Sequence, residues 1–139
     1  MTHDELVDKR AKEVEGKCKE RDHLREVLEN WKAPDSMRIP LYMHDAIIAW
    51  AVDYIRPGGF LMAVLQNNLV QAVNLSDQDN ASALRSYATF VYNELPSECW
   101  GSSEQCESWI GKGIKEYKQT DLEDKQIAQD TLKERKGLK

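Results

Sequence analysis

Residues 41–75, LYMHDAIIAWAVDYIRPGGFLMAVLQNNLVQAVNL, carry the clearest helical pattern of the sequence. Its apolar residues recur every three or four positions on both sides of the segment RPGG, a spacing that places them on one face of a helix. The pattern predicts one helix over residues 41–54 and another over residues 60–75. Between them, Pro57 disfavours helical angles at the residue before it, and the two glycines that follow permit positive φ in a tight reversal.

Two more helices follow this pair in the hydrophobic pattern. One ends before Pro96, and the other begins after the capping pair Ser102 and Gln105. The polar segment SDQDN, residues 76–80, supplies side chains that cap the helix after it. No stretch alternates between apolar and polar residues over the length of a strand. The chain is therefore predicted to be all-α, with a compact four-helix domain over residues 33–118.

Charge is concentrated in the two ends of the chain. The 139 residues hold 24 acidic and 19 basic side chains, which gives a net charge of −5 and a pI near 5.2. Residues 1–32 hold 17 charged side chains and residues 119–139 hold 10, whereas residues 33–118 hold only 16 and contain ten of the eleven aromatic residues. This division predicts an aromatic core between an N-terminal helical arm and a charged C-terminal tail, with a short helix that opens at the capping pair Thr120 and Glu123.

Composition excludes several classes of function. No window approaches the roughly 18 uninterrupted apolar residues of a membrane-spanning helix, and the N-terminus MTHDELVDKR is charged where a signal peptide is apolar. We therefore expect a cytoplasmic protein that does not contact a membrane. The acidic balance argues against broad nucleic-acid binding, because such surfaces carry clustered lysine and arginine.

The N-terminal arm, residues 1–32, has the pattern of one amphipathic helix with Thr2 as its N-cap. A stripe of small apolar side chains follows at coiled-coil spacing: Val7, Ala11, Val14 and Cys18. Arg21 and Arg25 occupy the next two positions of that stripe. Two interpretations are open, namely an arm that packs its last two turns on the domain while its start projects, and a coiled-coil arm that forms a homodimer.

The sequence contains no recognisable catalytic or metal-binding constellation. His44 and Asp45 are neighbours on a helix and point about 100° apart, so they cannot act on one target together, and His44 is expected to face solvent or to be half-buried. Cys99 and Cys106 are expected to be small buried thiols, and Cys99 is a nucleophile only if the fold brings a histidine to it. The histidine spacing does not fit zinc, and residues 77–80 do not fit a calcium loop. We expect no metal, no cofactor and no enzymatic activity.

Aromatic and arginine side chains form the candidate binding surface. Trp50 falls off the apolar face of its helix and Trp100 lies in a loop, so both are expected to be exposed. Trp, Tyr and Arg are the residue types that dominate interface hot spots. The predicted partner-binding surface consists of Trp50, Tyr54, Arg56, Arg85, Tyr92 and Trp100. The alternative is that these rings are purely structural.

A small-molecule site is a second interpretation of the same region. The turn from Arg56 to Phe60 leads into a helix whose first N–H groups could hold a phosphate, while Trp100 or Tyr92 stacks a base. No Lys–Ser or Lys–Thr pair follows the glycines as it does in a P-loop, so a tight interhelical turn is the stronger interpretation of that segment.

Residues 39–110 resemble a group of small bacteriophage and prophage proteins. The likeness rests on the order and spacing of short segments: Ile39-Pro40, Tyr54, Pro57-Gly58-Gly59-Phe60-Leu61, Ala63-Val64-Leu65, Asn68-Leu69, Asp79-Asn80, Tyr92-Asn93-Glu94-Leu95-Pro96, Cys99-Trp100-Gly101-Ser102 and Trp109. The resemblance implies a phage or prophage origin, and it carries over no catalytic residue because the group has no assigned activity. The arm and the charged tail lie outside the resemblance and are expected to serve assembly or partner binding.

These features together predict a phage-encoded accessory protein that binds a host or phage macromolecule, above all a protein, as a non-enzymatic inhibitor or adaptor. One alternative is a small-molecule binder that sequesters a nucleotide-like ligand. Another is a structural component of the virion.

Overall fold

The computed structural model describes residues 2–137, and within that range the chain is helical with no β-strand. The prediction of an all-α fold is confirmed. In this described part of the chain, none of the helices combines the length and apolar character that a bilayer span requires. The elements are α1 (His3–Asn30), the 3-10 helix η1 (Leu41–Met43), α2 (His44–Asp53), α3 (Gly59–Leu65), α4 (Leu69–Leu75), α5 (Gln78–Ser82), α6 (Leu84–Glu94), the 3-10 helix η2 (Ser97–Cys99) and α7 (Ser103–Gly137).

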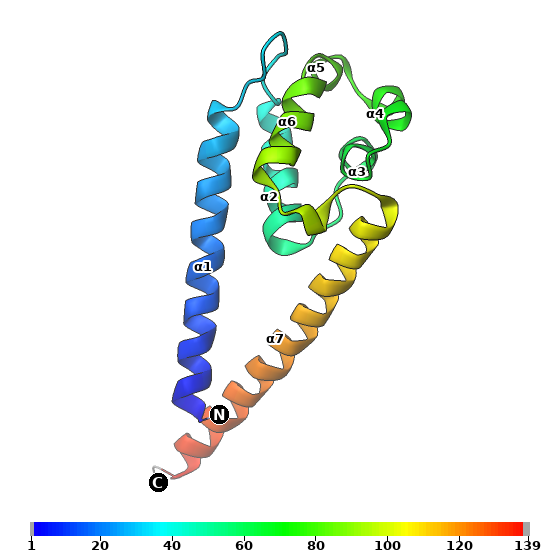
Figure 1. The fold of residues 1–139 in the computed structure, drawn as a ribbon. Helices are drawn as coiled ribbons and strands as arrows, with labels where there is room; N and C mark the ends of the chain where they lie inside the picture. The colour runs from blue at the N-terminus through cyan, green and yellow to red at the C-terminus, as the bar shows by residue number, and fades with distance from the viewer. Residues whose placement is uncertain (1, 138–139) are drawn as a thin grey trace.

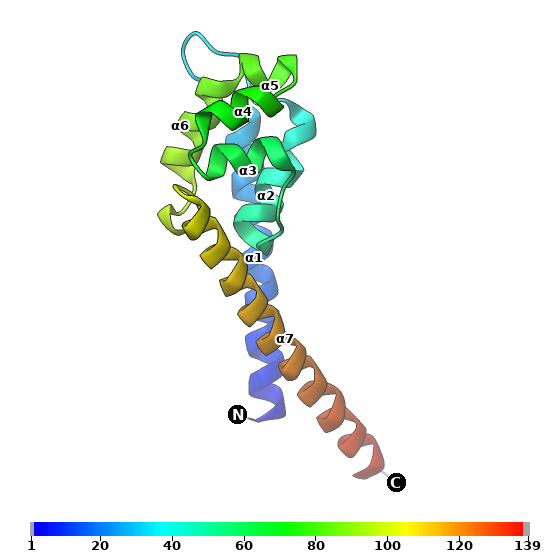
Figure 2. The ribbon, with the colours of Figure 1, turned by 90° about the vertical axis from the view of Figure 1, so that its right-hand side faces the viewer.

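Two long helices frame a cluster of short ones (Figure 1). α1 and α7 converge at the end of the molecule that holds both termini, and α2 to α6 gather around their other ends. The view turned by 90° shows α7 crossing α1 at an angle instead of running parallel to it (Figure 2). The core therefore lies at the wide end of a V formed by the two long helices.

α1 begins at a complete capping box. The hydroxyl of Thr2 accepts a hydrogen bond from the backbone N–H of Glu5 at 3.2 Å, and the Glu5 carboxylate accepts one from the Thr2 N–H at 3.4 Å. The prediction of Thr2 as N-cap is confirmed. At its other end α1 packs Leu24 and Leu28 into the core, where Leu28 is only 1% exposed. The helix gives way to extended backbone at Trp31.

α7 is one uninterrupted helix that crosses the predicted boundary at residue 118. Ser102 caps it as predicted, since its Oγ accepts a hydrogen bond from the N–H of Gln105 at 3.1 Å. The second predicted start, at Thr120, is wrong: residues 114–136 contain neither proline nor glycine, so nothing ends the helix there. Glu123 is not a capping residue but a side chain only 7% exposed that faces α1.

Charged side chains hold the start of α1 against the distal half of α7. The ion pairs are Lys9–Glu123 at 2.6 Å and Arg10–Asp124 at 3.2 Å; Lys17–Glu116 at 3.1 Å joins the two helices nearer the core, and the His3 ring lies 3.6 Å from the Asp130 carboxylate. The expectation that the start of the arm projects is therefore wrong. A seam built from ion pairs has no apolar periodicity, so it has the same sequence pattern as a solvated helix face.

The predicted coiled-coil stripe of α1 lies mostly outside this seam, although Val14 lines a hollow between α1 and α7 with Gly113 and Tyr117. α1 faces α7 with the buried Leu6, and adjacent residues point about 100° apart on a helix. All four residues of the stripe are exposed: Val7, Ala11, Val14 and Cys18. Homodimerisation through this stripe stays a prediction.

Aromatic side chains fill the centre of the core. Trp50, Tyr87 and Phe90 are completely buried, and the indole N–H of Trp50 donates to the carbonyl oxygen of Cys99 at 3.1 Å. The prediction of an exposed Trp50 is wrong. Buried residues surround most of the circumference of α2, so a position off its main apolar face also lies inside.

Non-glycine residues make the reversals after α2 and α3. Tyr54 and Asn67 have left-handed backbone, with φ of 59° and 62°, whereas Gly58 is extended at the N-cap of α3. The predicted reversal at the glycine pair is therefore wrong. Asn67 also breaks the predicted helix 60–75 into α3 and α4, because asparagine tolerates the left-handed region and Asn68 caps the new helix with its side chain.

Candidate functional site

The structure divides the predicted aromatic surface into separate parts. Trp50 is in the core, and Tyr54 is half-buried against Trp109 with ring centroids 4.5 Å apart. The guanidinium of Arg56 donates to Glu107 at 2.5 Å, and that of Arg85 donates to a backbone carbonyl at 3.3 Å. These residues therefore do not form one patch.

Tyr92 and Trp100 are the two predicted residues that the fold brings together at the surface. Their rings pack edge to face with centroids 6.0 Å apart; Tyr92 is 72% exposed and Trp100 is half-buried. The loop is held by a hydrogen bond from the N–H of Gly101 to the carbonyl oxygen of Leu65 at 2.7 Å. Trp100 is thus less exposed than predicted, because its loop is tied to the end of α3.

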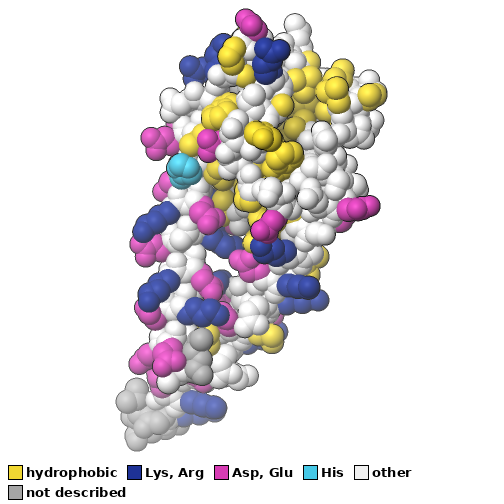
Figure 3. Space-filling view, viewed as in Figure 1, with side chains coloured by type: hydrophobic (Ala, Val, Ile, Leu, Met, Phe, Trp, Pro, Cys, Tyr) yellow, Lys and Arg dark blue, Asp and Glu magenta, His cyan; other side chains and the backbone are white. Residues whose placement is uncertain are grey.

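An apolar groove lies between α4 and α6, one helical turn from Tyr92. We call it the α4–α6 groove; it encloses about 150 Å³ and is lined by Ala63, Val64, Asn67, Asn68, Leu69, Ala72, Leu84, Ala88 and Val91. None of these side chains is charged. Figure 3 shows hydrophobic side chains gathered over α4 and α6, whereas charged side chains cover α1 and α7.

α4 extends this apolar surface with an exposed outer face. Leu69, Val70 and Val73 are 69%, 71% and 48% exposed, and Ala72 is the one buried residue of the helix. The hydrophobic pattern placed Leu69 and Val73 on the inner side of a helix continuous with α3. The break at Asn67 turns them outward, and the pair Asn67-Asn68 within an apolar run was the available sequence signal.

The two cysteines of the core are buried, as predicted. Burial raises the pKa of both thiols, that of Cys99 to about 12, so the Cys99 thiol is protonated at neutral pH. His44 is also buried, which corrects the prediction of a solvent-facing or half-buried ring. Its Nε2 lies 3.1 Å from the carbonyl oxygen of Ile39, a polar partner that makes burial of the imidazole tolerable.

The polar segment before α5 acts as a helix cap. Asp77 Oδ1 accepts a hydrogen bond from the N–H of Asn80 at 2.7 Å, which confirms the capping prediction. The Tyr42 hydroxyl also donates to Asp77; this bond lowers the pKa of the carboxyl and raises the pKa of Tyr42 to about 12. Within residues 2–137, no group of three or more His, Cys, Asp or Glu side chains is placed to hold a metal ion.

Comparison of the chain with protein-family models, curated proteins and solved structures finds no match.

Proposed function

We propose that this is a phage-encoded accessory protein that acts by binding another protein, and that the α4–α6 groove with Tyr92 and Trp100 is its binding surface. The phage origin is drawn from the sequence resemblance alone. The observation that carries the binding proposal is the contiguous apolar surface formed by the groove and the outer face of α4. Surfaces of this kind, flanked by Tyr and Trp, are typical of protein-recognition sites.

The uncharged walls of the groove define the chemistry of the partner. A charged segment would lose its hydration there without gaining an ionic partner, whereas an apolar segment would gain from burial. Full burial of one Leu or Val side chain is worth about 1.5–3 kcal/mol, so covering Leu69, Val70 and Val73 provides a large part of a micromolar affinity. We infer that the partner contributes the apolar face of a helix or an extended apolar segment.

The nucleotide-binding alternative receives less support from the geometry. Arg56 is engaged by Glu107, and the helix that follows the glycine turn, α3, is only seven residues long. A helix this short has a weak dipole to offer a phosphate. Within the described residues, no hydrogen bond or ion pair links Arg56 or Arg85 to the Tyr92–Trp100 pair.

The proposal is tested by capture of the partner with matched surface variants. Leu69→Lys places a charge at the groove, and Leu122→Lys places the same charge on α7 at a leucine of similar exposure, 62% against 69%. Wild type and Leu122→Lys should retain a stoichiometric partner from lysate of infected cells, or from purified virions if the partner is a virion protein, and Leu69→Lys should lose it. Equal recovery by Leu69→Lys, or recovery of no stoichiometric partner by the wild type, would contradict the proposal.

A further inference from the structure

A second concave site lies at the wide end of the V, away from the α4–α6 groove. We call it the α1–α6 pocket; it encloses about 360 Å³ between α1, the end of α2, the corner between α6 and η2, and the first half of α7. Its volume falls within the range of small-ligand sites. Its apolar walls are Leu24, Ala51, Val52, Leu95 and Pro96.

Two aromatic rings in contact, tilted by 39° relative to each other, line the pocket beside these apolar walls. The rings of Tyr54 and Trp109 have centroids 4.5 Å apart, and the Trp109 indole N–H donates to the carbonyl oxygen of Trp50 at 2.9 Å. These contacts fix both rings before any ligand arrives. Each ring already attracts a cation of the chain, since Lys17 Nζ lies 5.6 Å from the centroid of Tyr54 and Lys112 Nζ lies 5.3 Å from that of Trp109.

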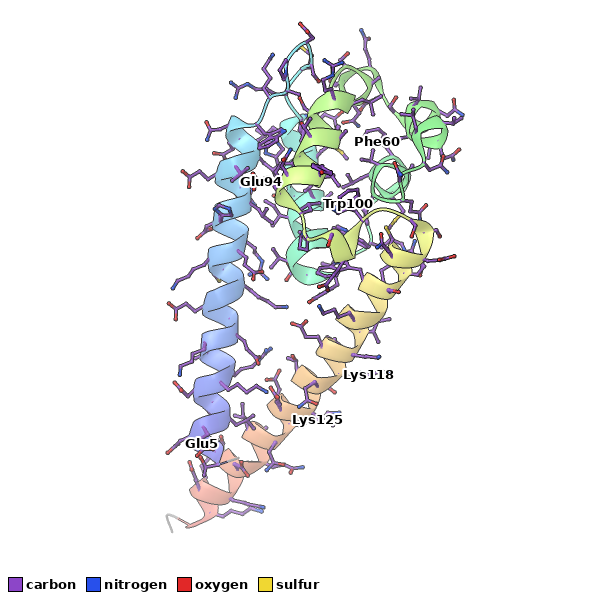
Figure 4. The ribbon with its side chains drawn as sticks, in the orientation of Figure 1. Glu5, Phe60, Glu94, Trp100, Lys118 and Lys125 are labelled. Atoms are coloured by element: carbon purple, nitrogen blue, oxygen red, sulfur yellow. The ribbon has the colours of Figure 1, made fainter. Side chains whose placement is uncertain are left out.

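The rim of the pocket is electronegative for two independent reasons. First, α2 and α6 both end there, and the carboxyl ends of helices carry partial negative charge. Second, the carboxylates of Glu20 and Glu94 line the pocket from two different helices, and neither has an ion-pair partner within residues 2–137. Figure 4 shows Glu94 on the side of α6 that faces α1.

Lys17, His23 and Glu116 are the other ionisable side chains that line the pocket. Lys17 forms an ion pair with Glu116 at 3.1 Å, so its charge is already balanced. Glu94 is also the last residue of α6, where its carboxylate adds to the negative end of the helix instead of opposing it. The carboxylates and the negative helix ends repel one another in the empty pocket. A bound cation would replace this repulsion by attraction.

We propose that the α1–α6 pocket binds an organic cation, an alkylammonium or guanidinium group on an apolar stem. The apolar walls and rings would bury the stem, and Glu20, Glu94 and the two helix ends would face the charged group. An anion, such as a nucleotide phosphate, would be repelled by the same groups. The ligand chemistry is shared by free amines and by the Lys or Arg side chain of a protein.

The test uses three probes with the same six-carbon stem: hexylammonium, hexanol and hexanoate. The full-length protein is titrated with each while the indole N–H resonance of Trp109 is followed by NMR, after assignment with Trp109→Phe. Hexylammonium should give a saturable shift at about tenfold lower concentration than hexanol, and hexanoate should give none. Equal binding of hexanol and hexylammonium, or no saturable shift with hexylammonium, would overturn the proposal.

Charge-neutral variants connect the effect to the named carboxylates. Glu20→Gln and Glu94→Gln should each weaken hexylammonium binding by about threefold, whereas Glu26→Gln, which removes an exposed charge elsewhere on α1, should not. Unchanged affinity in the Glu20→Gln/Glu94→Gln double variant would overturn the assignment.

A capped lysine tripeptide distinguishes a protein side chain from a free amine as the ligand. Tighter binding of the tripeptide than of hexylammonium assigns the pocket to a protein side chain, and weaker binding assigns it to a free amine. The pocket shares no lining residue with the α4–α6 groove, so either proposal can fail alone.

Discussion

At the residue scale, one glycine determines how closely α7 approaches the end of α2. A Cβ atom added at Gly113 would overlap the Cβ of Tyr54 and lie 2.5 Å from its Cγ. The Cβ of Tyr54 is attached directly to the backbone, so no rotation about χ1 or χ2 moves it away. Tyr54 itself has left-handed backbone, so its position is doubly constrained.

We expect Gly113→Ala to destabilise the protein by about 1–3 kcal/mol, the usual cost of overpacking. The measurement is urea unfolding followed by circular dichroism. Gly111→Ala is the matched control, because a Cβ there meets nothing within 4 Å and alanine is favoured over glycine by up to about 1 kcal/mol in a helix. Equal stability of the two variants would show that the Tyr54 contact does not form.

The three thiols should react at very different rates. Cys18 is exposed, whereas Cys99 and Cys106 are buried with raised pKa values, so both their access and their thiolate fraction are low. We expect one thiol per chain to be alkylated rapidly at pH near 8 and the other two only after denaturation. Peptide mapping of the labelled site provides the check. Rapid labelling of Cys99 in the native protein would contradict this expectation and would make Cys99 a candidate nucleophile.

At the element scale, α1 and α7 are joined by charge and only sparsely by apolar contacts. Glu123 is buried in this seam and accepts hydrogen bonds from Lys9 at 2.6 Å and from Gln119 at 3.0 Å. These bonds lower the pKa of Glu123 below its ordinary value of 4.5 and raise the pKa of Lys9. The seam is thus strongest when the carboxylate is ionised.

Acid should weaken the α1–α7 seam. A carboxyl with a lowered pKa in the folded state contributes stability above its unfolded pKa and loses that contribution as the pH falls through the folded value. The free energy of unfolding should therefore decrease from about pH 5 downward, and less steeply in Glu123→Gln, which cannot titrate. Urea denaturation between about pH 3 and pH 7 measures this, with the exposed Glu134→Gln as control. Identical pH dependence in wild type and Glu123→Gln would refute the role of the seam.

The homodimer predicted from the exposed stripe of α1 can be tested in solution. If Val7, Ala11, Val14 and Cys18 pair with a second copy, sedimentation velocity should show a dimer that dissociates on dilution, and Val14→Asp should be monomeric at every concentration. Val73→Asp on α4 is the matched control, since Val73 and Val14 are 48% and 50% exposed. A wild-type protein that stays monomeric throughout would remove the assembly role of α1.

At the scale of the whole molecule, α1 belongs to the folding unit. Leu24 and Leu28 are part of the same buried cluster as the core of α2 to α6. Loss of one such leucine side chain typically costs about 2–5 kcal/mol, and a whole domain is stable by only about 5–15 kcal/mol. The compact domain predicted over residues 33–118 lacks both leucines.

We therefore expect the fragment 33–118 to be unfolded and the fragment 21–118, which retains Leu24 and Leu28, to melt cooperatively. Circular dichroism melting curves and dispersion of the amide proton spectrum distinguish the two states. Cooperative melting of fragment 33–118 would show that the core needs no contribution from α1.

Features that depend on neighbours within a turn or two of helix could be predicted from the sequence. Apolar spacing predicted the helical class, and the caps at Thr2, Asp77 and Ser102 lie where their side chains meet backbone N–H groups three residues on. The burial of Cys99 and Cys106 was also predictable, because free cysteine is seldom exposed.

Features that depend on residues far apart in the chain could not be predicted, because they follow from how the helices pack. Lys9 and Glu123 are 114 positions apart, and in sequence each resembles a solvated charge. Trp50 is buried because other elements surround α2, and the face of α4 is exposed because a break at Asn67 rotates it away from the core. Local periodicity records which face of a helix is apolar, but what covers that face is fixed only when distant elements pack together.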